Sequence, residues 1–162
     1  MKLEQLHEKI KKSRKNPLSA QYNAVPGEGP ENAKIMLIGQ NPGKQENETG
    51  RPFIGRSGQL LTRTLEKCGI ERSKVFVTSV GKYGTPDNRL PTKEEVAFDL
   101  PFLEEQIKII KPKKILLMGA LARAFTPRIE GIEYFETIHP AAVLRFPNKF
   151  KDRFENDIKK LK

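Results

Sequence analysis

The chain has 162 residues and a net charge of +10, from 30 Lys and Arg against 20 Asp and Glu. This length is enough for a single domain, residues 1–162, around one core. The basic balance favours a polyanionic partner, nucleic acid above all. One cysteine and two histidines exclude a disulfide framework within the chain and argue against a metal site, so we expect no cofactor. We find neither a signal peptide nor an apolar run of membrane-spanning length, and we expect a soluble intracellular protein without a membrane partner.

Apolar residues recur at helical spacing in some segments and form short runs or alternate with polar residues in others. The short segments predict strands at residues 34–39, 75–80, 114–118 and 132–138. The helical spacing predicts helices at residues 2–14, 56–68, 92–110, 119–125 and 148–161. Short strands that alternate with helices are typical of a three-layer α/β protein, in which helices cover both faces of a mainly parallel sheet.

The first predicted strand ends in a loop rich in glycine and proline, Gly39–Gly43. Such a loop lies outside the carboxyl end of its strand, where open α/β sheets bind ligands. Pro42 restricts the backbone of Asn41, so this amide is held at the mouth of the predicted pocket. The segment TGRPFIGRSGQLL follows, and it contains one aromatic residue, Phe53, which we expect to be exposed.

A second motif, HPAAVLR, occupies His139–Arg145. Together the two motifs resemble the uracil-DNA glycosylase superfamily, and most of all its iron–sulfur branch, family four. That branch has a G-E-x-P-G loop followed by T-G-R-P-F-[VI]-G-[RK]-x-G-Q-L-L, and the superfamily has an H-P-[AS]-x-x-x-R loop. The resemblance covers residues 27–145, with the motifs in the same order and at similar spacing.

The resemblance implies a three-layer α/β/α fold with a central four-stranded, mainly parallel sheet of strand order 2-1-3-4. It also implies a monofunctional DNA glycosylase of base-excision repair. Such an enzyme flips a deaminated base, in the first place uracil, out of DNA and hydrolyses its N-glycosidic bond with water. We therefore expect DNA containing a deaminated base as the partner, a monomeric protein, and a location at the nucleoid.

The same resemblance implies which residues bind the base. Phe53 is the platform on which the flipped base stacks, and Gly39, Gln40 and Asn41 form the floor beneath it. Ser79, at the end of the second strand, stands where the family places an Asn that reads the uracil edge. A hydroxyl cannot make the two-atom contact that an amide makes. Another deaminated base, such as hypoxanthine, therefore stays open as an alternative substrate.

Two residues are predicted to act in catalysis. Asn41 is expected to orient the attacking water towards an oxocarbenium-like sugar carbon. A carboxylate, Glu46 or Glu48, is the alternative group for handling this water. His139 is expected to stabilise the negative charge that builds on the departing base.

A groove for DNA is predicted beside the pocket. Leu144 and Arg145 resemble a loop that inserts into the minor groove, with an apolar wedge and a cation. Further phosphate contacts are predicted at Arg51, Arg56, Lys82, Arg89 and Lys149. We expect Lys44 and Lys82 to be exposed, so that no desolvated lysine is available for covalent catalysis.

The chain departs from the iron–sulfur branch in its cysteines. That branch carries four, whereas this chain has only Cys68, which we expect to pack in the core. Tyr83 and Phe98 stand at or near two of the family's cysteine positions. We therefore expect the cluster to be absent and packing to fill its space.

Two other classes of function compete with a glycosylase. The first is a non-catalytic relative that binds nucleic acid, and the presence of Phe53, Asn41 and His139 argues against it. The second is a generic nucleotide-binding α/β protein, which would be expected to carry a G-x-G-x-x-G or Walker lysine motif that this chain lacks.

Overall fold

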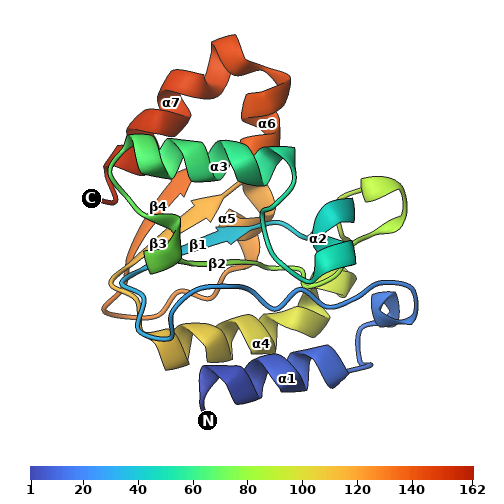
Figure 1. Cartoon of the computed structure of the whole chain (residues 1–162). Coiled ribbons are helices and arrows are strands. Elements are labelled where there is room, and N and C mark those ends of the chain that lie inside the picture. The colour runs from blue at the N-terminus through green and yellow to red at the C-terminus, as the bar shows by residue number, and fades with distance from the viewer.

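The structure, a computed structural model, describes residues 1–162 and is built on one four-stranded sheet (Figure 1). Its order is β2-β1-β3-β4, and every pair of neighbouring strands is parallel. The strands are β1 Ile35–Gly39, β2 Phe76–Ser79, β3 Lys114–Met118 and β4 Glu133–Thr137. The predicted strands and the strand order implied by the family resemblance are therefore confirmed.

Seven α-helices surround the sheet. They are α1 Leu3–Lys12, α2 Lys44–Thr49, α3 Arg56–Lys67, α4 Lys93–Ile110, α5 Ala120–Phe125, α6 Pro140–Arg145 and α7 Pro147–Lys159. Five of them match the predicted helices to within a few residues at each end. The other two, α2 and α6, lie in segments predicted as loops, because six residues are too few to show a helical period. None of the helices combines the length and the apolar character needed to span a bilayer.

Helices cover both faces of the sheet (Figure 1), and a hydrophobic core lies on each face. Met36 and Ile38 of β1 pack with α1, α4 and α5, whereas Leu37 packs with α3, α6 and α7. This alternation follows from the period of two residues in a strand. Because both faces are covered, the predicted three-layer α/β/α architecture is confirmed.

Behind the carboxyl end of β2 lies a group of buried polar side chains. The Lys82 side chain is fully buried, and its Nζ donates to Thr78 Oγ1 at 2.6 Å, to the Ser79 carbonyl at 2.7 Å and to Gln106 Oε1 at 2.9 Å. Burial lowers the pKa of Lys82, and the nearby Asp99 carboxylate opposes this shift. The prediction that Lys82 is exposed and contacts phosphate is wrong, because three acceptors from the protein interior surround its amine.

Asp99 ties three segments of the chain together beside this lysine. Its Oδ2 accepts from the Lys82 backbone N–H at 2.8 Å and from Asn16 Nδ2 at 3.2 Å. Asn16 Nδ2 also donates to the Glu95 carbonyl at 3.1 Å. The loop after α1, the loop after β2 and helix α4 are thereby joined by hydrogen bonds in a dry region, where polar groups are costly to leave unpaired.

Replacing Asp99 by alanine is expected to lower the free energy of unfolding by about 3 kcal/mol, because it leaves the buried Lys82 without its counter-charge. The measurement is urea unfolding of the wild type and the variant at pH 7. Asp152→Ala, which truncates an exposed aspartate on α7, is the matched control and is expected to change stability little. Equal stabilities of the two variants would contradict the importance of the buried pair.

Candidate active site

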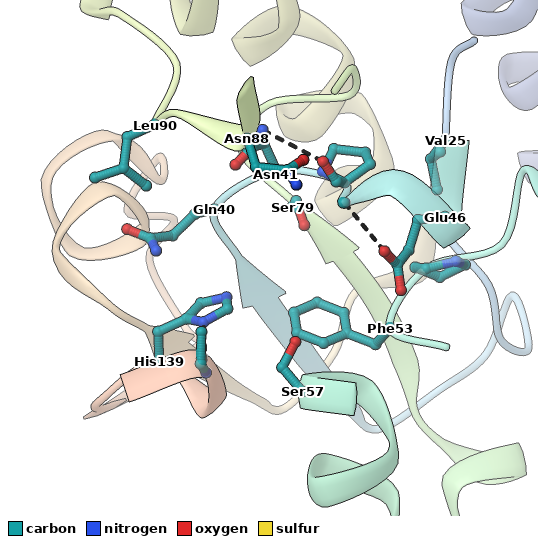
Figure 2. A pocket seen from close by; sticks show the side chains of 14 residues that line it. Val25, Gln40, Asn41, Glu46, Phe53, Ser57, Ser79, Asn88, Leu90 and His139 are labelled. Carbon is teal, nitrogen blue, oxygen red and sulfur yellow. Dashed lines mark hydrogen bonds between the residues drawn. The ribbon is translucent and has the colours of Figure 1, made fainter. Parts of the chain in front are cut away.

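A pocket of about 320 Å³ opens at the carboxyl ends of the strands (Figure 2). It is lined by 14 residues: Val25, Gln40, Asn41, Pro42, Gly43, Glu46, Pro52, Phe53, Ser57, Ser79, Asn88, Leu90, His139 and Ala141. A pocket of this size is at the small end of those that hold organic ligands. It lies where open α/β sheets bind their ligands, as the position of the Gly39–Gly43 loop predicted.

Phe53 lies in the wall of the pocket in an unusual backbone conformation. Its φ is 49°, in the left-handed region, and its side chain is buried with 7% exposed. A Cβ added at Gly39 would come within 2.4 Å of its ring, and one at Gly58 within 1.9 Å of its backbone carbonyl. These two glycines therefore make the space that Phe53 occupies. The prediction of an exposed ring is wrong, because the ring packs against the end of β1.

Glu46 joins the two glycine-rich segments that form this wall. Its Oε1 accepts from the Gly43 backbone N–H at 3.1 Å, and its Oε2 accepts from Ile54 at 2.9 Å and Gly55 at 2.7 Å. Both oxygens are thus engaged with backbone donors, which leaves Glu46 poorly suited to activate water. Glu48, the other carboxylate considered for that role, is exposed on α2 and does not line the pocket.

Arg72 supports the same wall from outside the pocket, a role that no sequence motif indicated. Its guanidinium donates to the carbonyls of Pro52 and Phe53, each at 2.5 Å, and to Thr62 Oγ1 at 2.9 Å. Hydrogen bonds from a charged donor are the stronger ones in proteins. Arg72 and Glu46 therefore hold the unusual backbone at Phe53 from its two sides.

Asn41 and Gln40 follow β1 directly and face the pocket. Asn41 Nδ2 lies 3.4 Å from the carbonyl oxygens of both Pro42 and Tyr83. These contacts occupy the donor end of the amide and leave Oδ1 without a protein partner. A free acceptor at a fixed place can orient a water molecule, although an amide cannot take its proton.

His139 begins helix α6, beyond the end of β4. Its Nδ1 accepts from the Ala141 backbone N–H at 3.1 Å, which places the proton of the neutral ring on Nε2. Burial lowers the pKa of His139 from 6.5 to about 4, so the ring is neutral at pH 7. Its centroid lies 5.8 Å from that of Phe53, with the rings tilted by 34°. The site therefore holds a neutral N–H donor beside an aromatic surface.

Ser79 lies at the last position of β2, next to Gly39 of β1 in the strand register. A Cβ at Gly39 would be 3.4 Å from Ser79 Oγ, so these residues lie close together at the base of the pocket. Its hydroxyl makes no hydrogen bond within the protein and is available to a ligand. Asn88 and Ser57 also line the pocket, although the sequence analysis gave neither of them a role in it.

Apart from the buried Lys82, the cations that were predicted to contact DNA lie on the surface, and their surroundings differ. Arg51 pairs with Glu28 at 2.7 Å, and Arg89 pairs with Glu95 at 2.8 Å. Arg56 is exposed at the start of α3. The other two cations lie over aromatic rings, Arg145 over Phe146 and Lys149 over Phe150, at 5.5 and 5.1 Å from the ring centroids. Leu144, the predicted wedge, is half-buried in α6 and does not line the pocket.

The residues at the family's cysteine positions do not fit an iron–sulfur cluster. Tyr83 presents a buried ring with 3% exposed, whereas Phe98 points outward with 42% exposed. Cys68 follows α3 in the other layer, half-buried, with its Sγ 3.8 Å from the Glu155 carbonyl. Clusters are held by several thiolates gathered at one point, and this chain has one thiol. The expected packing holds for Tyr83 but not for Phe98.

The chain is similar in sequence to proteins of known function. Residues 26–162 match the uracil DNA glycosylase superfamily. The chain belongs to this superfamily. It is 40% identical to a type-4 uracil-DNA glycosylase of Pyrobaculum aerophilum, over 98% of this chain and 92% of that protein. It is 36% identical to those of Sulfurisphaera tokodaii, over 99% of this chain and 83% of that protein, and of Thermotoga maritima, over 99% and 93%.

Replacing Glu46 by glutamine is expected to lower the free energy of unfolding by about 2 kcal/mol. In the wild type both carboxylate oxygens accept hydrogen bonds from backbone N–H groups. In the variant one of these oxygens is replaced by an NH₂ group, which cannot accept a hydrogen bond. Glu48→Gln, two residues along the same helix, is the matched control and is expected to stay within about 0.5 kcal/mol of the wild type. Urea unfolding of the three proteins is the measurement, and a Glu46→Gln variant as stable as the control would refute the bridging role.

Stability is expected to fall as the pH drops from 6.5 to 4. Burial lowers the pKa of both His7 and His139 to about 4, so in this range the unfolded chain binds protons that the folded chain does not. At pH 5 relative to pH 7 we expect a loss of about 2 kcal/mol from His139 and a smaller loss from His7, which is less deeply buried and therefore more screened by solvent. The measurement compares urea unfolding of the wild type with a His7→Gln/His139→Gln variant. The variant is expected to lose less stability than the wild type, and parallel losses would contradict the assignment.

Proposed function

We propose that this protein is a DNA glycosylase of base-excision repair that hydrolyses the N-glycosidic bond of uracil in DNA. The observation that carries the proposal is the pocket in which Asn41, Phe53 and His139 come together at the carboxyl end of the sheet. The relatives that are named type-4 uracil-DNA glycosylases support it over nearly the whole chain. The net charge of +10 suits a DNA substrate.

The flipped base stacks on Phe53 and reaches the base of the pocket with its polar edge. A base must leave the duplex stack before an enzyme can act on its glycosidic bond. Gln40 and Ser79 offer polar groups to that edge, and Gly39 allows the ring of Phe53 to approach closely. The ring is fixed in place, so stacking costs little additional ordering.

Asn41 acts on the attacking water, and His139 acts on the departing base. The free Oδ1 of Asn41 accepts a hydrogen bond from the water and directs its oxygen at the sugar carbon. The Nε2–H of neutral His139 donates to the departing base as negative charge builds on it. A preorganised donor of this kind is worth about 10² to 10³ in rate.

Water is the nucleophile, because no lysine amine lies in the pocket. Lys82 is desolvated, as an amine for a Schiff base would be, but its amine is enclosed by Thr78, the Ser79 carbonyl and Gln106. Lys44 is exposed on α2. The reaction therefore ends with release of the free base and an intact abasic strand.

The hydroxyl of Ser79 supports some activity on a second deaminated base. A site that binds its substrate on two atoms rejects analogues strongly, because its own buried groups are otherwise left unpaired. Ser79 offers one rotatable hydroxyl there, so hypoxanthine remains a secondary substrate in the proposal.

The DNA backbone runs past the pocket over the surface cations. In this proposal Arg51, Arg56, Arg89 and Lys149 contact phosphates, and Arg145 is the cation that enters the minor groove. The protein acts on DNA as a monomer in this proposal. A DNA substrate places the protein at the nucleoid.

Asn41→Ala and His139→Ala are each expected to slow single-turnover excision of uracil by about a hundredfold or more, because both residues act in the transition state. Binding of uracil-containing DNA is expected to change little. The measurement is excision from oligonucleotides with one uracil, hypoxanthine or xanthine, beside a DNA-binding titration. Arg63→Ala, which removes an exposed cation on α3, is a control for the general effect of a surface substitution.

The wild type itself tests the proposal first. A protein that binds such DNA and releases no base from any of the three oligonucleotides is the non-catalytic relative instead. If Asn41→Ala or His139→Ala excises uracil at the wild-type rate, the replaced residue has no role in the mechanism.

A further inference from the structure

Four large apolar side chains are exposed on this protein: Met1, Leu90, Phe98 and Phe146. Leu90 is the one among them that lines the pocket, and 56% of it is exposed. It comes from the loop between β2 and α4, and Figure 2 shows it across the pocket from Phe53 and Glu46. An exposed leucine is ordinary by itself, so its meaning depends on how firmly it is held at the rim.

The loop that carries Leu90 has an unusual and well-supported backbone. Asp87 and Asn88 both have left-handed φ angles, 56° and 54°, which are uncommon in residues other than glycine. The Thr85 hydroxyl donates to the Arg89 carbonyl, and the Asn88 N–H donates to the Thr85 carbonyl at 3.2 Å. Conformations of this kind persist where the surroundings hold them, and they are concentrated at functional sites.

Arg89 and Glu95 fix the residues on both sides of Leu90. The Arg89 guanidinium donates to both carboxylate oxygens of Glu95, at 2.8 and 2.9 Å, and to the Leu90 carbonyl at 3.1 Å. Glu95 also accepts from the Thr92 N–H at 2.8 Å, within the capping box of α4. Pro91 is buried directly after Leu90. An apolar side chain is therefore held out into solvent by a rigid support.

We propose that Leu90 is the wedge that enters the base stack of duplex DNA and fills the space that the flipped base leaves. This inference rests on the proposed glycosylase function. Apolar wedges between base steps offset the cost of unstacking by burying their own surface. Leu90 has surface left to bury, and because its loop is already ordered, insertion costs side-chain freedom but no further ordering of the backbone.

The assignment differs from the prediction made from the sequence, in which Leu144 was the wedge. Leu144 is half-buried in α6, so it has less apolar surface to offer to DNA. Leu90 stands at the rim of the pocket itself, where the gap in the stack opens when the base enters. The Leu90 side chain therefore blocks the return of the flipped base to the stack. Arg89 holds the Leu90 backbone in position through its hydrogen bond to the Leu90 carbonyl.

A wedge matters only when there is a stack to hold open. Leu90→Ala is expected to slow single-turnover excision of uracil from duplex DNA by about tenfold or more, since a leucine side chain buries enough apolar surface for such an effect. On single-stranded DNA of the same sequence, the loss is expected to be several times smaller than on duplex DNA, because no stack has to be held open there. Leu90→Phe keeps a bulky apolar group and is expected to retain most of the duplex activity.

The experiment measures single-turnover excision by the wild type, Leu90→Ala, Leu90→Phe and Leu144→Ala on matched duplex and single-stranded oligonucleotides. Phe98→Ala, which truncates an exposed ring on α4 away from the pocket, is the matched control. Activity on single strands shows in the same assay that each variant is folded. If the wild type releases no base from either substrate, the glycosylase function is refuted. If the wild type is active, the variants test the inference about Leu90 independently of that function.

Three results would overturn that inference while leaving the function intact. Equal losses by Leu90→Ala on duplex and single strands would make Leu90 a contact of the flipped nucleotide. If only Leu144→Ala loses activity, and only on duplex DNA, then Leu144 of α6 is the wedge. Full duplex activity in Leu90→Ala would leave the side chain without a role in flipping. A loss confined to duplex DNA in Leu90→Ala, with rescue in Leu90→Phe, supports the wedge.

Discussion

The carboxylate of Glu46 is the interaction on which the geometry of the pocket depends. It accepts from backbone N–H groups on two separate segments, Gly43 on one and Ile54 and Gly55 on the other. The first segment positions Asn41, and the second positions Phe53. Backbone donors bound to an ionised carboxylate form strong hydrogen bonds. The distance between Asn41 and Phe53 across the pocket is thus set by one side chain, Glu46.

The base of the pocket has a different kind of support. There the Lys82 amine holds the Ser79 carbonyl from behind, and Asp99 connects the Lys82 backbone to Asn16. Buried charges of this kind add little to stability compared with apolar packing, but they specify one arrangement, because each partner is costly to leave alone. The backbone of Ser79 at the base of the pocket is therefore held in one position from behind.

The pocket is assembled from three separate parts of the chain. Its floor comes from the strand ends, its aromatic wall from the segment before α3, and its rim from the loop before α4. The rim faces solvent and carries Leu90, whereas His139 lies deeper, where burial lowers its pKa to about 4. The exposed apolar side chain and the neutral imidazole therefore belong to one pocket.

The sequence by itself determined the alternation of strands and helices, the loop after β1 and the two motifs, because these depend on neighbouring residues. Only the tertiary structure decided that Lys82 is buried, that Glu46 bridges two segments and that Leu90 stands at the rim. The reason is physical: some of the partners are distant in the chain, as Gln106 is from Lys82 by 24 positions and Asp99 from Asn16 by 83. Even the nearer partners of Glu46, up to nine positions away, meet its carboxylate only when both glycine-rich segments have folded. A local pattern reports how the backbone prefers to fold, whereas the burial of a charge depends on which acceptors the completed fold brings to it.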